Sequence, residues 1–185
     1  MRAGWGMKND IERILIDEEV IEKRLDAMAV EIERDFPEGT LVVIVLLKGA
    51  LVFAADLLRR VSRPLEIECV NVASYHGGTE SSGKVDFLDR NFPEVKGRHV
   101  LLLDDILDTG RTLHAVDERL RAEGAAAVHT GVLLAKDKER AEDVTADYIG
   151  FRIGDEFVVG YGLDYKGKYR NLPYVGVLKT SAQGL

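Results

Sequence analysis

Two adjacent aspartates, followed by a short turn rich in hydroxyl groups, are the residues in this chain best suited to chemistry. Asp104 and Asp105 come directly after the apolar run 100–103, and Asp-Thr-Gly-Arg-Thr occupies 108–112. The apolar run predicts a short strand that is buried on both faces, as in a parallel sheet. Both carboxylates would then lie at the carboxyl end of a strand, where open α/β sheets place their ligand crevices.

The turn at 108–112 has the composition of an anion site. Asp108, Thr109 and Gly110 lead into an amphipathic helix that carries Leu113, Val116 and Leu120. Backbone N–H groups and hydroxyls converge in such a turn, with the positive end of the helix dipole behind them, and this arrangement suits a phosphate. The sequence contains neither a Walker loop nor a Gly-x-Gly-x-x-Gly dinucleotide turn.

The carboxylate pair and the phosphate turn together indicate a particular kind of ligand. Neighbouring carboxylates repel each other, and a hard cation or the hydroxyl groups of a ligand would relieve that repulsion. The alternative for Asp104 and Asp105 is an ordinary solvated strand end. The adjoining turn favours a ligand that combines phosphate with hydroxyl groups or bound metal.

Two further segments could contribute to the same crevice. Lys48 and Gly49 follow the apolar run 40–47, which predicts a central strand, although an ordinary strand-to-helix turn would look the same. Residues 75–84 are glycine, hydroxyl and charged residues with little to bury, which predicts a lid or, alternatively, a flexible hairpin tip. His76 in this loop is expected to be solvent-exposed rather than a catalytic base.

The surrounding sequence alternates between strand and helix patterns. This alternation predicts an α/β fold with a mainly parallel sheet, in a single domain of residues 1–185. A short apolar piece at 11–16 precedes a helix that begins after Asp17 and continues to Pro37. The remaining expected elements are a helix at 50–61, strands at 65–74 and 125–134, a charged helix or turn at 137–142, and strands at 146–151, 157–160 and 174–178.

Composition excludes several classes of protein. The chain is 46% hydrophobic and 31% charged, as expected of a globular protein, and its net charge of -7 argues against broad nucleic-acid binding. No apolar run approaches a membrane span, and the first residues do not form a secretory signal. Cys69 is the only cysteine and lies in an alternating apolar run, so we expect it in the core. A cytoplasmic, reducing location is expected.

The motifs resemble those of a known family. Residues 101–112 resemble the phosphoribosyl-pyrophosphate motif of the type I phosphoribosyltransferases. The resemblance narrows to the hypoxanthine-guanine phosphoribosyltransferases through further segments in the family's order and approximate spacing: 47–49, the loop from Ser74, Lys136, and 157–165 with Arg170. It extends from about residue 11 to residue 178. It implies a twisted sheet flanked by helices, a small hood from about 1–16 and 150–180, and a flexible lid loop at 75–84.

The resemblance also implies a reaction in purine salvage. Hypoxanthine or guanine would displace pyrophosphate from phosphoribosyl pyrophosphate, giving IMP or GMP through an oxocarbenium-like transition state, with Mg2+ as cofactor. Asp108 would be the catalytic residue, the proton partner at purine N7. The ribose and 5′-phosphate would be bound by Asp104, Asp105, Asp108, Thr109, Gly110, Arg111 and Thr112. Many family members carry glutamate at position 104, and Arg111 occupies a variable position.

Residues for the other two parts of the substrates follow from the same resemblance. Lys136 would donate to the purine 6-oxo group, and Phe157 would stack on the base. The full purine set is Lys136, Phe157, Val158 and Asp164, and the pyrophosphate set is Lys48, Gly49, Ser74, Tyr75 and Arg170. Magnesium would be bound by Asp104, Asp105 and Asp164. The Leu47–Lys48 peptide bond would be cis, and the chain would form a homodimer or homotetramer.

Two alternative functions are compatible with part of this pattern. An enzyme that prefers xanthine could use the same lysine and aromatic residue. A nucleic-acid-binding regulator could keep the fold to sense phosphoribosyl pyrophosphate. Such a sensor need not retain Lys136, Phe157 and Asp164, so their presence favours an enzyme acting on small molecules, with no nucleic-acid or membrane partner.

Overall fold

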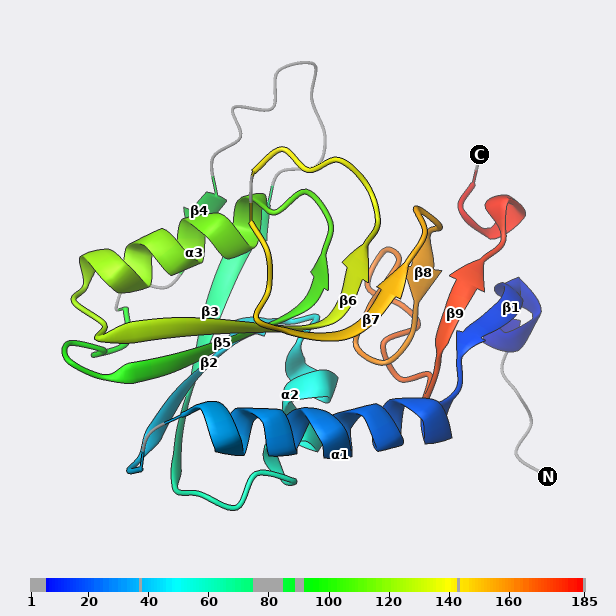
Figure 1. Cartoon of the computed structure of the whole chain (residues 1–185). Helices are drawn as coiled ribbons and strands as arrows, with labels where there is room; N and C mark the ends of the chain where they lie inside the picture. Colours follow the sequence, from blue (N-terminus) through cyan, green and yellow to red (C-terminus); the bar gives the residue numbers. More distant parts are fainter. Residues whose placement is uncertain (1–5, 37, 75–84, 89–91, 143, 185) are drawn as a thin grey trace.

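The protein consists of a large mainly parallel sheet and a small antiparallel one (Figure 1). This computed structural model describes residues 6–36, 38–74, 85–88, 92–142 and 144–184. The expected lid, 75–84, therefore lies outside the described residues. In the described part of the chain, the large sheet has the order β4-β3-β2-β5-β6-β7. Its strands, in that order, are Val85–Phe87, Leu65–Ser74, Leu41–Leu47, His99–Leu107, Ala127–Lys136 and Tyr148–Ile153.

The pairing confirms the predicted α/β class. Strands β3, β2, β5, β6 and β7 run parallel, and β4 pairs antiparallel with β3. Helices α1 (Glu18–Asp35) and α2 (Leu51–Leu58) lie on one side of the large sheet, and α3 (Arg111–Ala122) lies on the other (Figure 1). None of the helices in the described ranges is long and apolar enough to cross a membrane.

The continuous apolar sequence of β2 follows from this layering. Val43 and Val45 pack into the core on the α1 and α2 side, whereas Val42, Ile44 and Leu46 pack into the core beneath α3. A strand covered on both faces needs apolar residues at every position, which is why the run lacks alternation. The helices show the complementary pattern: α1 buries Ile21, Leu25, Met28 and Ile32, and α3 buries Leu113, Val116 and Leu120.

The second sheet joins the two ends of the chain. It has the order β1-β9-β8, formed by Ile11–Ile16, Val175–Leu178 and Val158–Val159, and both pairings are antiparallel. Short 3-10 helices, Gly6–Asp10 and Thr180–Ala182, flank β1 and β9. We call this sheet and its connecting segment 154–174 the hood. Residues 150–153, which the sequence assigned to the hood, belong to β7 of the large sheet.

Several sequence-based expectations need correction. Strand β5 continues to Leu107 instead of ending at Leu103, because β6 runs alongside it and pairs as far as Ala135. Asp104 and Asp105 therefore lie within the strand. Helix α2 ends at Leu58, and other boundaries shift slightly; of the two alternatives for 137–142, helix or turn, the structure has no helix there.

Cys69 is exposed, although its apolar neighbours predicted a core position. It shares a face of β3 with Ile67, which is 53% exposed. The helices on that side contact other strands, α1 with β7 and α2 with β2 and β5, so this part of β3 stays uncovered.

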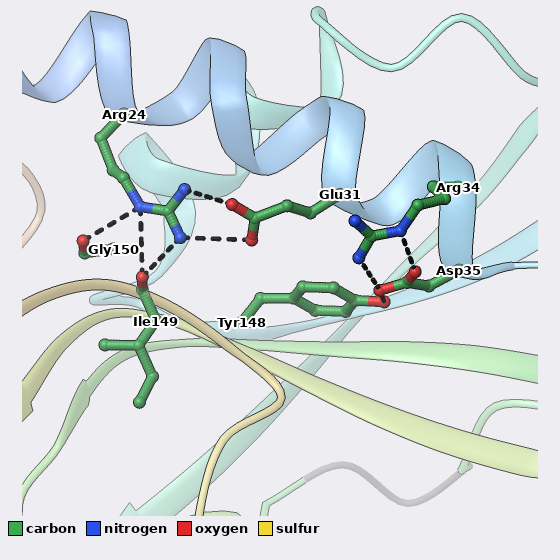
Figure 2. A network of polar contacts seen from close by, with 7 residues as sticks. All are labelled: Arg24, Glu31, Arg34, Asp35, Tyr148, Ile149 and Gly150. Atoms are coloured by element: carbon green, nitrogen blue, oxygen red, sulfur yellow. Dashed lines mark hydrogen bonds and ion pairs between the residues drawn. The ribbon is translucent and has the colours of Figure 1, made fainter.

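Helix α1 is fixed to the edge strand β7 by a partly buried arginine (Figure 2). Arg24 donates to the carbonyl oxygens of Ile149, at 2.8 Å, and Gly150, at 3.1 Å, and its guanidinium pairs with Glu31 at 2.7 Å. Carbonyls on the free edge of a sheet lack a partner strand, and the guanidinium supplies donors to the backbone there. Farther along the helix, Asp35 pairs with Arg34 and accepts a hydrogen bond from Tyr148.

We predict that Arg24→Met lowers the free energy of unfolding by about 2 kcal/mol, because it removes charge-assisted bonds to partly buried carbonyls. The control is Arg34→Met, whose side chain is 72% exposed and should cost less than about 0.5 kcal/mol. Urea denaturation of both variants measures the difference. Equal decreases in the free energy of unfolding would show that the carbonyl contacts of Arg24 do not stabilise the fold more than the exposed ion pair of Arg34 does.

Candidate active site

The carboxyl ends of β2 and β5 border a cavity of about 240 Å³. The two strands are parallel neighbours, so the residues that follow them arrive at the same edge of the sheet. The lining comprises Leu46, Leu47, Gly49, Val72, residues 104–110, Thr112, Leu113, Asp164 and Arg170. Most residues predicted to bind ribose, phosphate and pyrophosphate thus come together from distant parts of the chain.

The Asp104–Asp105 pair is held in a poorly solvated position. The backbone N–H of Asp105 donates to Oδ1 of Asp104 at 2.9 Å. Burial raises the pKa of the Asp104 carboxyl well above its usual value, and the neighbouring Asp105 charge adds to the effect. Burial also raises the pKa of Asp105, and the positive charge of Arg170 partly offsets this rise. These carboxylates are therefore suited to a partner that brings hydroxyl donors or positive charge.

The loop after β2 lies extremely close to this pair. A Cβ atom on Gly49 would lie 1.6 Å from Oδ2 of Asp105, so a larger residue there would require the Asp105 side chain or the loop to move. The Leu47–Lys48 peptide bond is cis, as the resemblance implied. The Lys48 side chain is exposed and does not line the cavity.

The predicted phosphate turn leads directly into α3. Gly110 adopts a left-handed conformation (φ 81°) just before the helix, and Thr109, Gly110 and Thr112 line the cavity. The first N–H groups of a helix have no partner within it, so they are available to an anion. The Thr109 carbonyl accepts hydrogen bonds from the backbone of Ala141 (3.1 Å) and Glu142 (3.3 Å). Arg111 does not line the cavity.

The hood contributes an arginine–aspartate pair on the opposite side of the cavity. Arg170 pairs with Asp164 at 2.6 Å and donates to the Gly162 carbonyl at 2.6 Å. The other oxygen of Asp164 accepts from the Gly167 N–H at 2.7 Å. A Cβ atom on Gly162 would lie 2.2 Å from the Gly49 carbonyl oxygen, so the hood touches the loop after β2.

Of the predicted purine residues, Lys136 reaches the phosphate turn. Lys136, at the end of β6, is only 8% exposed, and its Nζ lies 3.4 Å from Oδ2 of Asp108. Phe157 is 42% exposed, with Tyr165 packed edge-on against its ring at 5.5 Å. Val158 is buried in β8. Lys136, Phe157 and Val158 do not line the cavity, whereas Asp164, the fourth residue of the predicted purine set, does.

Two charged residues of this region were missed from the sequence. Lys138 pairs with both Asp108 and Asp155, and Asp155 pairs with Lys136 at 3.0 Å. Asp155 lies between the strands expected at 146–151 and 157–160, where the sequence indicated no chemistry, and the two-residue spacing of Lys136 and Lys138 was the available signal. Of the remaining predicted residues, Ser74 ends β3 and Tyr75 lies outside the described residues.

Comparison with known proteins identifies the family. A family model described as "Phosphoribosyl transferase domain" matches residues 14–166. The hypoxanthine-guanine phosphoribosyltransferase of Bacillus subtilis is 43% identical over 175 residues, which covers 95% of this chain and 97% of the relative. The enzyme of the same name from Staphylococcus epidermidis is 42% identical over 174 residues, covering 94% and 97%.

Solved structures agree with the sequence relatives. A crystal structure of a hypoxanthine phosphoribosyltransferase from Staphylococcus aureus matches with a TM-score of 0.91 at 39% identity, covering 97% of this chain and 98% of that one. The likeness extends over both sheets, because nearly the whole chain is covered. The chain therefore belongs to the phosphoribosyltransferase family, and within it to the hypoxanthine-guanine phosphoribosyltransferases.

Proposed function

We propose that this chain catalyses magnesium-dependent transfer of the phosphoribosyl group from phosphoribosyl pyrophosphate to N9 of hypoxanthine or guanine. The products would be pyrophosphate and IMP or GMP. The observation that carries this proposal is the 3.4 Å separation of the Lys136 ammonium and Asp108 Oδ2, beside a phosphate turn. In the tautomer with its proton on N7, a 6-oxopurine presents a donor, N7–H, next to an acceptor, O6, so an acceptor placed beside a donor complements that edge.

The large sheet would bind the sugar and its phosphate. The turn from Asp108 to Thr112 would hold the 5′-phosphate through backbone N–H groups and the hydroxyls of Thr109 and Thr112. Asp104 and Asp105 would accept hydrogen bonds from the ribose 2′- and 3′-hydroxyls. Their raised pKa values support this role, because hydroxyl donors favour the ionised form that burial disfavours.

The pyrophosphate would lie between the loop after β2 and the hood. Gly49 allows the backbone to approach closely, and Arg170 and Lys48 would supply positive charge. As the bond to pyrophosphate breaks, positive charge develops on the ribose and negative charge on the leaving oxygens. Cations on the pyrophosphate side would stabilise the negative charge on the leaving oxygens, and carboxylates on the ribose side would stabilise the positive charge on the ribose. Ser74, Tyr75 and the lid at 75–84 are proposed to exclude water from the reactive carbon.

A magnesium ion fits the available carboxylates. Asp104, Asp105 and Asp164 supply the oxygen ligands that Mg2+ prefers, and all three line the cavity. Mg2+ usually binds one or two carboxylates together with substrate phosphates and water, so the three aspartates need not enclose the ion by themselves. The bound ion would neutralise charge on the pyrophosphate.

Asp108 and Lys136 would act on the purine. Asp108 would take the proton from N7 as N9 attacks, which requires it to lie within hydrogen-bond reach of the ring. Lys136 would donate to O6 and so disfavour a 6-amino purine, whose amino group is itself a donor. Phe157 would stack on the base, and its exposed ring leaves room for this contact. Relative use of hypoxanthine, guanine and xanthine, and assembly as a homodimer or homotetramer, stay predictions.

We expect Asp108→Asn to lower kcat by about 10²- to 10⁴-fold, the usual contribution of general acid–base catalysis. The Kd for phosphoribosyl pyrophosphate should change little, because backbone groups and threonines carry the phosphate. Initial rates with hypoxanthine and calorimetric binding of phosphoribosyl pyrophosphate test both parts. Asp26→Asn, on the exposed surface of α1, is the control. A kcat within twofold of the unmodified protein would remove Asp108 as the proton partner.

Lys136→Ala should raise the KM for hypoxanthine by about 10- to 100-fold, the value of one hydrogen bond to a charged group. Discrimination against adenine should fall, since the donor that disfavours its amino group is gone. Rates with a panel of hypoxanthine, guanine, xanthine and adenine measure both effects. Lys23→Ala, an exposed lysine of α1, serves for comparison. Unchanged kcat/KM values for every base would contradict the assignment.

Gly49→Ala is predicted to raise the KM for phosphoribosyl pyrophosphate by about tenfold or more, because the new Cβ would displace Asp105 or the loop. The KM for hypoxanthine should change much less. Gly97→Ala is the matched control: its positive φ costs stability, but nothing lies within 4 Å of the added carbon. If both variants show the same KM values, the Gly49 contact does not organise the site.

A further inference from the structure

Two lysines and two aspartates form a closed cluster at the margin of the cavity. Asp155 Oδ1 accepts from both Lys136 Nζ and Lys138 Nζ at 3.0 Å. Lys138 also forms an ion pair with Oδ1 of Asp108, and Lys136 lies 3.4 Å from Oδ2 of Asp108. The cluster is balanced in formal charge. Lys138 and Asp155 have no role in the function proposed above.

The two oxygens of Asp108 are in different situations. Oδ1 is enclosed from solvent and makes no hydrogen bond of standard geometry among the described residues, but the Lys138 ammonium lies against it. Oδ2 faces Lys136 at the longer distance of 3.4 Å. A purine that binds Lys136 through O6 would weaken only this second, looser contact. Lys138 would then be the cation that still holds the carboxylate.

We propose that Lys138 is a positioning residue for the transfer reaction. By holding Oδ1 of Asp108, it turns Oδ2 toward the Lys136 ammonium, so that acceptor and donor together meet the N7–O6 edge of the base. Asp155 anchors the Lys138 ammonium and retains it when the purine takes Lys136. This inference rests on the proposed function, since it concerns the same reaction.

The backbone around Lys138 is braced in a way that suits this role. The Asp137 N–H donates to the Ile153 carbonyl at 2.8 Å, and Arg140 donates to the Lys136 carbonyl at 3.0 Å. The next residues, Ala141 and Glu142, bond to the Thr109 carbonyl, in the same turn as Asp108. The loop that carries Lys138 is therefore tied to both strand ends and to the turn that it would position.

The electrostatic setting keeps Lys138 charged. The carboxylates of Asp108 and Asp155, which both contact its ammonium, raise the pKa of Lys138 above its usual value. The side chain is 29% exposed, so the long methylene stem is partly packed while the ammonium reaches the cluster. A cation of fixed position, rather than a mobile surface lysine, faces Asp108.

The test compares Lys138→Met with Lys138→Arg in the full-length protein. Methionine keeps the length of the side chain without the charge, whereas arginine keeps the charge. We expect Lys138→Met to lower kcat with hypoxanthine by about tenfold, the order expected when a catalytic group is misplaced, with an unchanged KM for phosphoribosyl pyrophosphate. Lys138→Arg, which keeps the positive charge, should have a kcat within about threefold of that of the unmodified protein. Lys23→Met on α1 is the control.

A double-mutant cycle separates positioning from a general structural effect. In the Asp108→Asn background, Lys138→Met should have no further effect on kcat, because the carboxylate that it positions is gone. A tenfold loss in both backgrounds, an unchanged kcat, or an increase in kcat would each overturn the proposal. Melting temperatures accompany every rate, and Lys138→Gln replaces Lys138→Met if that variant melts early. Absence of turnover in the unmodified protein would instead overturn the proposed function.

Discussion

The closest approach in the site brings Gly49 against the Asp105 carboxylate, with no space for even one additional carbon atom. This contact exists because β2 and β5 are parallel neighbours whose carboxyl ends reach the same edge of the sheet. Gly162 of the hood in turn packs against the Gly49 carbonyl, where an added Cβ atom would also overlap its neighbour. Three segments far apart in the sequence thus meet at one point, and the positions of the acidic pair, the loop after β2 and the hood all depend on it.

Charge is distributed unevenly around that point. On the base side, Lys136 and Lys138 neutralise Asp108 and Asp155, and on the hood side Arg170 neutralises Asp164. Asp104 and Asp105 have mainly each other as neighbours, and burial raises the pKa values of both. The residues proposed to bind the base are therefore already paired with one another, whereas those proposed to bind the ribose would gain most from hydroxyl groups and a cation that a substrate brings.

The sequence predicts the local features well and the long-range ones poorly. The apolar run of β2 and the Leu113, Val116 and Leu120 spacing of α3 each identified an element, because burial on particular faces leaves a direct pattern. Asp104 and Asp105 were expected after the strand, but their placement within it depends on how far β6 extends. Cys69 is exposed because no described helix covers that part of β3. The apolar pattern of one strand does not predict which part of it a helix will cover. Lys138 and Asp155 were missed because their ion pair joins two separate loops, and the sequence pattern of one loop does not show which residue of another it contacts.

Pairing between the two ends of the chain holds the hood in place. Strand β1 pairs with β9, Tyr169 donates to Asp10 at 2.8 Å, and these contacts hold the segment that carries Phe157 and Arg170. In the proposed reaction the base would be bound from the hood side and the sugar phosphate from the large sheet, so alignment of N9 with the anomeric carbon depends on how the two parts meet. Besides the contact of Gly162 with Gly49, the Tyr161 hydroxyl donates to Asp56 of α2 at 2.5 Å. Since α2 begins immediately after the loop that holds Gly49, both contacts fix the hood to the same short stretch of chain, the one that also approaches Asp105.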